Sequence, residues 1–403
     1  MQLGALRHSL EKELEGLGII SCHEHHLIPE RGELVTLDYI FDNSYVGWCG
    51  VDTGSTPDER ESFIYKVGTN SYYRWLALGL QRLYGFDGEL SAANWEEISE
   101  SITSRHRSPD WYFHILHCHA GIEQAVLDAY WHPGSDNGHP EFYRPTFRIN
   151  ALVMSHSRGV KDHNGNNAWQ LFAPYGMEPS SFAEYLEAVE FLLTAKKQEG
   201  CVALKCALAY DRSMAFDEAA REDAEAAFGM KDAVPKQVKA FQDYVFHFIV
   251  ERAGALELPL QCHVGLGKIG GSNPMYLVPL IEKHPGTKFV LFHGGYPWTR
   301  EIGGLLHNYP NVYADLVWLP LISPTAAVQA LHEWIETAVT SEKITWGGDC
   351  WTPEETFGAV LALRWTAAKA LADKVQDGYF SYQRALELAR QIFSENARKL
   401  YGI

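Results

Sequence analysis

Short apolar runs, each followed by a polar or titratable side chain, recur along this chain. Five of these runs end at residues with metal-binding or proton-transfer chemistry, namely His23 with His25, Lys205, His263, His293 and Asp349. A short continuous apolar run is typical of a parallel strand that is buried on both faces. The pattern therefore predicts buried strands whose ends carry functional side chains.

Eight strands are predicted, near 17–22, 122–128, 146–153, 201–206, 258–262, 288–293, 311–316 and 343–348. Helical patterns lie between them, at 181–197, 235–255, 273–283, 298–308, 325–338 and 354–373. Alternation of strands and helices is typical of βαβ units and a parallel sheet. We expect an α/β fold, a (β/α)8 TIM barrel formed by residues 1–403 as one domain, with the polar strand ends at its C-terminal mouth.

Two segments are too long to be simple connections. Residues 27–120 are rich in aromatic residues and helical patterns, and we predict a helical insertion after the first strand, over the C-terminal mouth. Trp48, Tyr73 and Trp75 in this segment are candidates for an apolar wall, although core packing is the favoured interpretation. The acidic, Ala-rich segment 211–234 is either a lid or a solvated helix, and the second is favoured.

The charge of the chain narrows the range of partners. It has 34 Lys+Arg against 51 Asp+Glu, a formal net charge of −17, which argues against nucleic acid and anionic membranes. Residues 1–18 lack the apolar core of a signal peptide, and no run reaches membrane-spanning length. We expect a soluble, cytoplasmic homo-oligomer that acts on a small molecule.

Cysteines adjoin several of the strand-end residues. The chain has 7 Cys without a C-x-x-C pair, and Cys22, Cys206, Cys262 and Cys350 each lie next to a proposed ligand. Because side chains alternate along a strand, these four are predicted to point away from the ligands as small buried residues. This interpretation is favoured over zinc ligation or disulfides, and it indicates a reducing compartment.

The strand-end residues match the chemistry of a metal site. His23 and His25 are two residues apart, which on a strand places both imidazoles on one face. His263 and His293 are one βα unit apart, at the same height on neighbouring strands. Together with Asp349 they suit Zn²⁺, and Mn²⁺, Fe²⁺ or Co²⁺ fit as well. The alternatives are buried core histidines and, for Asp349, a helix cap.

This set of residues resembles the amidohydrolase superfamily, and in particular its "amidohydrolase 2" group. That group includes the amidohydrolase halves of proteins fused to glutamine-synthetase-like domains. The matching segments are Ser21-Cys22-His23-Glu24-His25, His293-Gly294-Gly295-Tyr296-Pro297 and Asn311-Val312-Tyr313-Ala314-Asp315. Ser21 stands where many members have Asp, which removes one anchor of the ligands. The resemblance extends from residue 17 to the end of the chain and is strongest over 200–350.

The resemblance implies a role for each strand-end residue. The implied metal ligands are His23, His25, Lys205, His263, His293 and Asp349. Asp349 would be the general base that takes a proton from metal-activated water and then the acid that returns it. His293 would be a ligand or, if free, a group that polarises the substrate carbonyl. Lys205 would be carboxylated and bridge two metal ions, or charged and bound to a substrate carboxylate or to Asp349; the two-ion form is slightly favoured.

Three residues are candidates for substrate binding. Arg148, on the third predicted strand, would bind a substrate carboxylate or form a structural ion pair, and the two interpretations carry equal weight. Tyr210 follows Lys205 and Tyr296 follows His293, so both are expected to line the pocket.

Three functions fit the sequence. The first is a metal-dependent hydrolase of an amide or related C–N bond. The second is a metal-dependent, non-oxidative decarboxylase on the same fold, since related groups include both classes. The third is a non-catalytic binding or scaffold protein, against which the intact ligand set argues.

Overall fold

The computed structural model describes residues 3–30 and 32–403. Within these ranges, eight strands belong to one sheet with the neighbour order β1-β2-β3-β4-β5-β6-β7-β8. All pairs from β3 to β8 are parallel. A parallel eight-stranded sheet whose neighbours follow chain order is the topology of a (β/α)8 barrel, so the predicted fold class is confirmed.

Every observed strand overlaps a predicted apolar run. The strands are β1 Ile19–Glu24, β2 Ile122–Leu127, β3 Tyr143–Arg148, β4 Ala203–Cys206, β5 Leu260–Cys262, β6 Phe289–Leu291, β7 Val312–Asp315 and β8 Ile344–Thr345. The strand register pairs Arg148 with Lys205, and Lys205 with Gln261. These three long polar side chains therefore start from adjacent positions on neighbouring strands.

The prediction for the third strand is wrong in its second half. The strand ends at Arg148, and the apolar segment after it forms the short helix α7, Asn150–Met154. A short, fully buried apolar run satisfies a strand and a buried helical turn equally well, so periodicity alone does not separate them. The correction places Arg148 at the end of β3 instead of near its beginning.

The helical patterns correspond closely to observed helices, and the pattern at 235–255 coincides with α11. The helices of at least four residues that follow α geometry are α1 Leu3–Glu15, α2 Leu37–Asp42, α3 Pro57–Val67, α4 Ser71–Tyr84, α5 Trp95–His106, α6 Trp111–His114, α7 Asn150–Met154, α8 Ala168–Phe172, α9 Phe182–Gln198, α10 Arg221–Ala227, α11 Pro235–Ala255, α12 Val278–Lys283, α13 Thr299–Asn308, α14 Leu319–Ile322, α15 Pro324–Thr337, α16 Pro353–Gln376, α17 Tyr382–Arg390 and α18 Asn396–Tyr401. The described helices include none that is long and apolar enough to cross a membrane.

The chain divides into two compact units. Unit 1 contains Met1–Ala125, Leu316–His332 and Trp346–Glu395, and unit 2 contains Val126–Asp315, Glu333–Thr345 and Asn396–Ile403. His23, His25 and Asp349 lie in unit 1, whereas Lys205, His263 and His293 lie in unit 2. The assignment of the whole chain to one domain stays a prediction.

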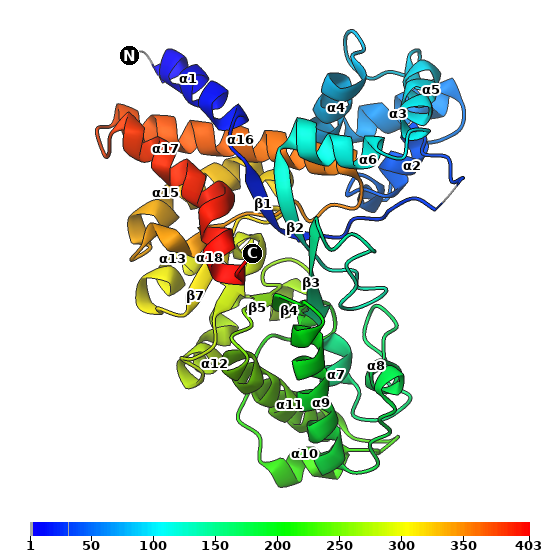
Figure 1. Cartoon of the computed structure of the whole chain (residues 1–403), viewed down its shortest axis with the longest axis vertical. Helices are drawn as coiled ribbons and strands as arrows, with labels where there is room; N and C mark the ends of the chain where they lie inside the picture. Colours follow the sequence, from blue (N-terminus) through cyan, green and yellow to red (C-terminus); the bar gives the residue numbers. More distant parts are fainter. Residues whose placement is uncertain (1–2, 31) are drawn as a thin grey trace. The chain divides into compact units, whose positions relative to one another are not determined.

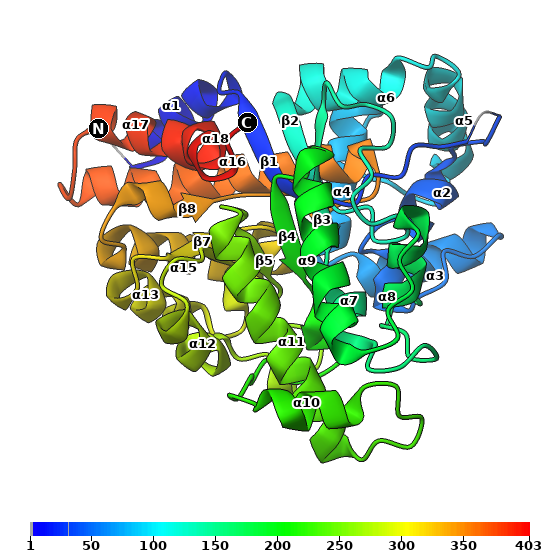
Figure 2. The same ribbon diagram turned by 60° about the horizontal axis from the view of Figure 1, so that its bottom comes forward.

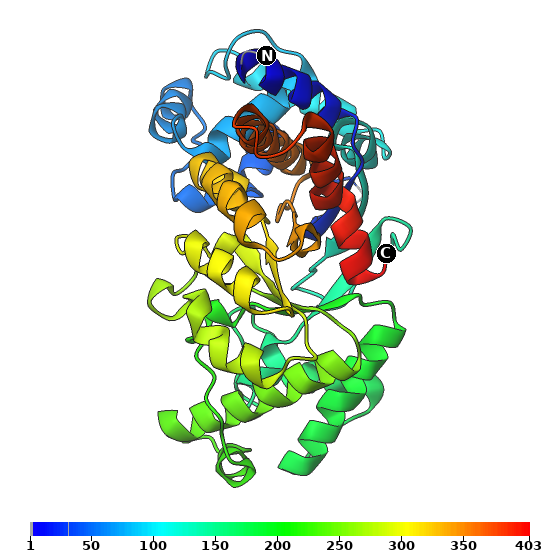
Figure 3. The ribbon, with the colours of Figure 1, turned by 90° about the vertical axis from the view of Figure 1, so that its left-hand side faces the viewer.

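Unit 1 contains the predicted helical insertion and the long helix α16. Helices α2 to α6 lie between β1 and β2 in the chain, and the apolar faces of α2 to α5 form a common core that includes Phe41, Phe63, Tyr73 and Trp95. Helix α16 runs beside α1 and α17 (Figures 1 and 3). A Cβ atom at Gly358 would lie 2.8 Å from the Trp75 carbonyl oxygen, so this glycine allows α16 to approach α4 closely.

Unit 2 carries α9 and α11 side by side (Figure 2). The short helix α10, within the acidic segment 211–234, packs on α11 and buries Ala224 and Ala227. This segment is therefore a packed helix with one solvated face, close to the favoured sequence interpretation. The yellow-green part of Figure 2 shows the α12 and α13 helices that precede and follow β6.

Candidate metal centre

His23, His25 and Asp349 form a compact cluster in unit 1. The Oδ1 atom of Asp349 lies 3.4 Å from His23 Nε2 and 3.2 Å from His25 Nε2. The two imidazole rings meet edge to face, with centroids 4.8 Å apart. All three side chains are buried, so the cluster concentrates three metal-binding atoms in a small, water-poor space.

The donor atoms of this cluster fit a metal ion. Two ligand atoms at the usual zinc distance and the tetrahedral angle lie about 3.3 Å apart. The two N···O separations of 3.2 and 3.4 Å match that spacing. Within the described residues, this is the group of three His, Cys, Asp or Glu side chains whose ligand atoms all lie within 4.8 Å of one another. Two imidazoles and a carboxylate suit Zn²⁺ and several other divalent ions, so the geometry supports a metal without identifying it.

Backbone pairing with β1 holds the segment that carries Asp349. The Asp349 N–H donates to the His23 carbonyl, and the His25 N–H donates to the Cys350 carbonyl, both at 2.9 Å. A Cβ atom at Gly347 would lie 2.7 Å from His23 N, so a glycine two positions before Asp349 is needed for this approach. Asp349 itself has a φ of +63°, a left-handed conformation that is costly for a non-glycine residue. Such strain is common at functional sites, and here it directs the carboxylate toward the imidazoles.

Glu24 connects the two segments from the opposite face of β1. Its carboxylate accepts hydrogen bonds from Gly348 N at 3.1 Å and Cys350 N at 2.9 Å, on either side of Asp349. Ser21 Oγ donates to the same carboxylate at 2.6 Å. Ser21, which replaces the Asp common in the resembling family, therefore supports the ligands indirectly, through Glu24.

Tyr45, from the insertion, completes the surroundings of Asp349. Its hydroxyl donates to Asp349 Oδ2 at 2.6 Å, so Oδ1 remains directed at the two histidines. The Tyr45 N–H donates to Glu355 Oε1 at 2.7 Å, and this bond holds the backbone from which the tyrosine side chain extends. Burial, with smaller contributions from the charges of Glu24 and Asp349, raises the pKa of Glu355 to about 8. A carboxyl group that burial keeps neutral is typical of the environment of a functional site.

His263 and His293 form a second cluster, in unit 2. His293 Nε2 and His263 Nδ1 share a hydrogen bond of 2.8 Å, and the rings meet edge to face with centroids 4.2 Å apart. Burial and the neighbouring His293, Lys205 and Arg148 hold the pKa of His263 well below its usual range, so this imidazole is neutral. The Lys205 ammonium lies 3.9 Å from the centre of the Phe292 ring. This cluster is rich in nitrogen donors and positive charge.

Arg148 forms a structural ion pair. Its guanidinium donates from Nε and Nη2 to Asp128, with the shortest contact at 2.6 Å, and from Nη1 to Asn164 Oδ1 at 2.7 Å. This is one of the two interpretations left open by the sequence. The role of Arg148 in substrate binding stays a prediction.

Tyr210 and Tyr296 are both partly exposed, and their place in a substrate pocket stays a prediction. The centroid of the Tyr210 ring lies 4.5 Å from that of the His263 ring and 5.0 Å from that of the His163 ring. His163 Nδ1 in turn bonds to Asp211 Oδ2 at 2.8 Å. This Asp–His pair beside Tyr210 was not predicted from the sequence.

The structure thus brings His23, His25 and Asp349 together in one unit, and Lys205, His263 and His293 together in the other. The single centre with six ligands stays a prediction. Sequence reasoning missed Tyr45 and the bracing role of Glu24. Tyr45 lies in an insertion with many aromatic residues and no distinguishing pattern. Glu24 lies between the two histidines, and the alternation of side chains along a strand predicts that it points to the opposite face.

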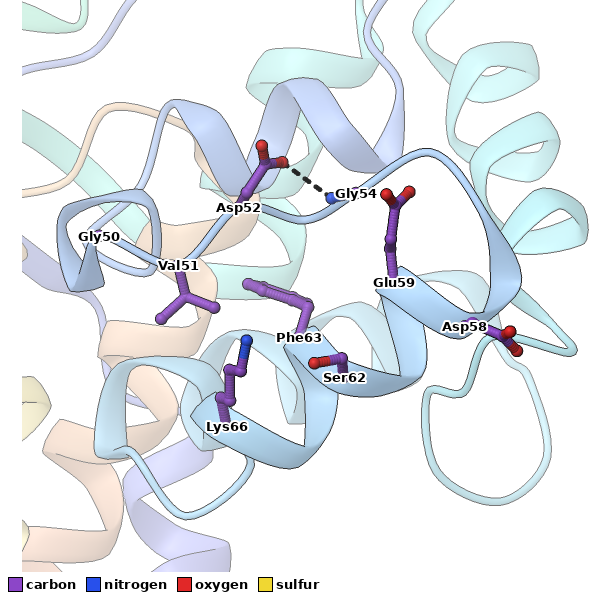
Figure 4. A pocket seen from close by; sticks show the side chains of 9 residues that line it. All are labelled: Gly50, Val51, Asp52, Gly54, Asp58, Glu59, Ser62, Phe63 and Lys66. Carbon is purple, nitrogen blue, oxygen red and sulfur yellow. Dashed lines mark hydrogen bonds between the residues drawn. The ribbon is translucent and has the colours of Figure 1, made fainter.

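A separate pocket of about 450 Å³ lies in the insertion (Figure 4). Its lining combines the carboxylates of Asp52, Asp58 and Glu59 with Lys66. Asp52 accepts from Gly54 N at 2.9 Å, and Glu59 accepts from the Thr56 backbone and side chain at 3.0 and 2.9 Å. These two acids close a turn and cap α3, and the pocket contains none of the predicted site residues.

Comparison with known families identifies the family of this chain. The chain is a (β/α)8 barrel protein with a candidate metal site formed by two histidines and an aspartate. The model of the amidohydrolase family matches residues 156–403, more than half of the sequence. The chain therefore belongs to the amidohydrolase family, and the resemblance noted from its motifs is confirmed. Members of this superfamily are metal-dependent enzymes.

Individual relatives show how far this likeness extends. Protein fluG of Emericella nidulans is 39% identical over 151 residues, which are 36% of this chain and 17% of fluG. This chain thus spans only a small part of that curated relative. Among solved structures, a uronate isomerase of Thermotoga maritima has a TM-score of 0.77 at 18% identity, covering 98% of this chain and 97% of its own. A candidate metal-dependent hydrolase of Lactobacillus casei has a TM-score of 0.73 at 20% identity, with the same coverage of 98% and 97%. At these identities the likeness establishes the fold alone.

Proposed function

We propose that this protein is a metal-dependent hydrolase that cleaves an amide or related C–N bond of a small molecule. The observation that carries the proposal is the cluster of His23, His25 and Asp349, with ligand-like spacing and with Tyr45 on the outer carboxylate oxygen. A structural role for these three residues would not require a strained Asp directed at two imidazoles.

Each residue has a distinct task in this proposal. His23, His25 and Asp349 would hold a divalent ion, which supplies Lewis acidity and makes water nucleophilic near neutral pH. Asp349 accepts a proton on its carboxylate and returns it to the leaving amine. Tyr45 keeps Asp349 Oδ2 occupied by a hydrogen bond, so that proton transfer is restricted to the side that faces the histidines. The zinc ion named from the sequence is part of this proposal.

Carboxylation of Lys205, with two ions per chain, belongs to the same proposal. A buried ammonium beside the neutral imidazole of His263 is electrostatically costly, and conversion to an anion would remove that cost. Support comes from the burial of Lys205 at 2% exposure and from its register next to Arg148.

Two rival chemistries share the fold. A non-oxidative decarboxylase would release CO₂ from a substrate carboxylate. The uronate isomerases among the structural neighbours would release neither an amine nor CO₂. Fold alone does not separate these reactions.

The test combines metal analysis with product detection. The purified protein is analysed for metals, then incubated with panels of small amides, aromatic and aliphatic carboxylates, and uronates. Free amine, CO₂ and ketose are measured, each in the wild type and in Asp349→Asn. Amine release that depends on metal and on Asp349 supports the proposal. Release of CO₂ or formation of ketose, with no amine from any amide, would overturn it.

A further inference from the structure

Trp48 is an exposed aromatic residue beside a buried aromatic cluster. Its side chain is 58% exposed, whereas Tyr45, Trp318 and Trp351, which surround it, are at most 6% exposed. An indole ring that keeps most of its surface in water loses the stabilisation that burial would give. An exposed ring that is held by its neighbours offers a ligand a large contact area at a low cost in conformational entropy.

Three rings and a tight turn hold Trp48 in place. Its ring centroid lies 5.1 Å from both Tyr45 and Trp351 and 6.5 Å from Trp318. Trp48 lies in the 3₁₀ turn η1, Gly47–Cys49. Glycine is favoured at both ends of the turn. Gly50 has a φ of 67°, and a Cβ atom at Gly47 would lie 3.0 Å from two carbonyl oxygens of α2. The exposed ring is thus presented on a rigid support.

The same rings lead directly to the metal-binding residues. Trp351 stacks on His25, with centroids 5.3 Å apart and an interplanar angle of 28°. Tyr45 donates its hydroxyl to Asp349. Trp48 touches both Trp351 and Tyr45, so it is one ring away from two of the three candidate ligands, and all of these residues belong to unit 1.

We infer that Trp48 is a substrate-binding residue that stacks against an aromatic or other planar unsaturated group of the substrate. A largely exposed ring that packs against other rings favours a flat partner, because stacked and edge-to-face pairs add attraction beyond burial of area. This inference rests on the proposed function, since it takes the metal as the anchor of the reacting group. It assigns the substrate class: a small molecule whose scissile or metal-binding group is attached to a planar ring.

Hydroxamates provide the test, because they bind metal ions in hydrolase sites without being consumed. The protein is loaded with the ion found by metal analysis and titrated in a calorimeter with acetohydroxamate, cyclohexanecarbohydroxamate and benzohydroxamate. These probes share the chelating group and differ in the attached group: small, bulky but not flat, and flat. Benzohydroxamate is expected to bind about three- to tenfold more tightly than cyclohexanecarbohydroxamate, the scale of one aromatic pair.

Variants then assign the preference to Trp48. Trp48→Ala should abolish the preference for benzohydroxamate and leave the affinity for acetohydroxamate unchanged, whereas Trp48→Phe should retain part of it. Tyr65→Ala is the matched control, because Tyr65 is also an aromatic residue of the insertion, at 90% exposure on α3. Metal content is measured in each variant to show that the centre is intact.

The outcomes separate this inference from the proposed function. If none of the hydroxamates binds to metal-loaded protein, the metal centre of the proposed function fails. If all three bind with equal affinity, or if benzohydroxamate keeps its advantage in Trp48→Ala, the inference is overturned and the metal centre stands. Equal tightening by the cyclohexyl and phenyl groups would also overturn it, since apolar area and not stacking would then be responsible.

Discussion

The two histidine clusters of this protein are built in opposite ways. In unit 1, His23 and His25 face the carboxylate of Asp349, and Glu24 and Glu355 accept hydrogen bonds from the backbone of Cys350 and Trp351, which follow Asp349. In unit 2, His263 and His293 face each other and lie among positive groups, Lys205 and Arg148, that depress the pKa of His263. A cation is therefore attracted by the first cluster as it stands, whereas the second offers neutral nitrogen donors in positive surroundings. We therefore predict that the unit 1 cluster binds an ion first, and that unit 2 binds one only after a change at Lys205.

The largest effect is expected for His23→Ala or His25→Ala. Each variant removes one of three close donors, so bound metal and activity should be lost together. Elemental analysis after gel filtration measures the metal. His139→Ala is the control, because His139 is a histidine bonded to a carboxylate, Glu141, at 3.1 Å and lies outside both clusters. Unchanged metal content in both unit 1 variants would reverse the comparison.

Asp349→Asn should give the next largest effect. The amide keeps the shape of the side chain and loses its basicity, so turnover should fall roughly 10²-fold or more, the usual scale for a lost general base. The kcat/KM profile of the wild type should fall on the acid side as Asp349 takes up a proton, and this limb should be absent in the variant. Turnover close to that of the wild type would assign the base to another residue.

Lys205→Ala tests whether unit 2 contributes a second ion. If Lys205 is carboxylated, metal content should drop from about two to about one or less per chain, and short carboxylates should partly restore it by replacing the lost oxygens. Mass analysis of the native wild type should find the added CO₂. A wild-type content of one ion that is unaffected by Lys205→Ala would restrict metal binding to the unit 1 cluster.

Tyr45→Phe should lower turnover less than Asp349→Asn does, and it tests how Tyr45 assists Asp349. A hydrogen bond to a charged group contributes about 1.5–3 kcal/mol, which corresponds to a roughly 10- to 100-fold change. We expect kcat to fall on this scale with retention of metal, and the acid limb of the pH profile to shift upward, because an ionised Asp349 loses a stabilising donor. Tyr65→Phe, an exposed tyrosine, is the control. Loss of the metal itself would show that Tyr45 builds the cluster and does not merely orient Asp349.

The smallest effect concerns a third histidine pair, His247 and His284, which share a hydrogen bond of 2.9 Å in unit 2. Burial, with the neighbouring His247 and Lys283, lowers the pKa of His284 to about 4. An unfolded histidine has a pKa of about 6.5, so between these values the unfolded chain binds the proton and the folded chain does not. Stability should therefore fall as the pH drops from about 6.5 to about 4. His284→Asn should flatten this decline in Tm, whereas His307→Asn, at an exposed histidine, should leave it unchanged.

Much of the fold was predictable because buried parallel strands and amphipathic helices leave periodic patterns. All eight strands overlap their predicted runs, and α11 has the predicted bounds. The third strand was misplaced, since the apolar residues after Arg148 satisfy a strand and a buried helical turn alike. Whether these residues form a strand or a helical turn depends on their packing with distant segments, which the local pattern does not contain.

The sequence by itself determined the fold class, the family and the identity of the ligand candidates, because each depends on residue type and spacing within short segments. Only the tertiary structure decided that Asp349 faces His23 and His25, that Tyr45 binds its second oxygen and that Arg148 pairs with Asp128. Tyr45 and Asp349 are separated by 304 positions, and no local pattern records a partner at that distance. Contacts of this kind arise from the packing of whole elements, where many weak interactions jointly select one arrangement of side chains.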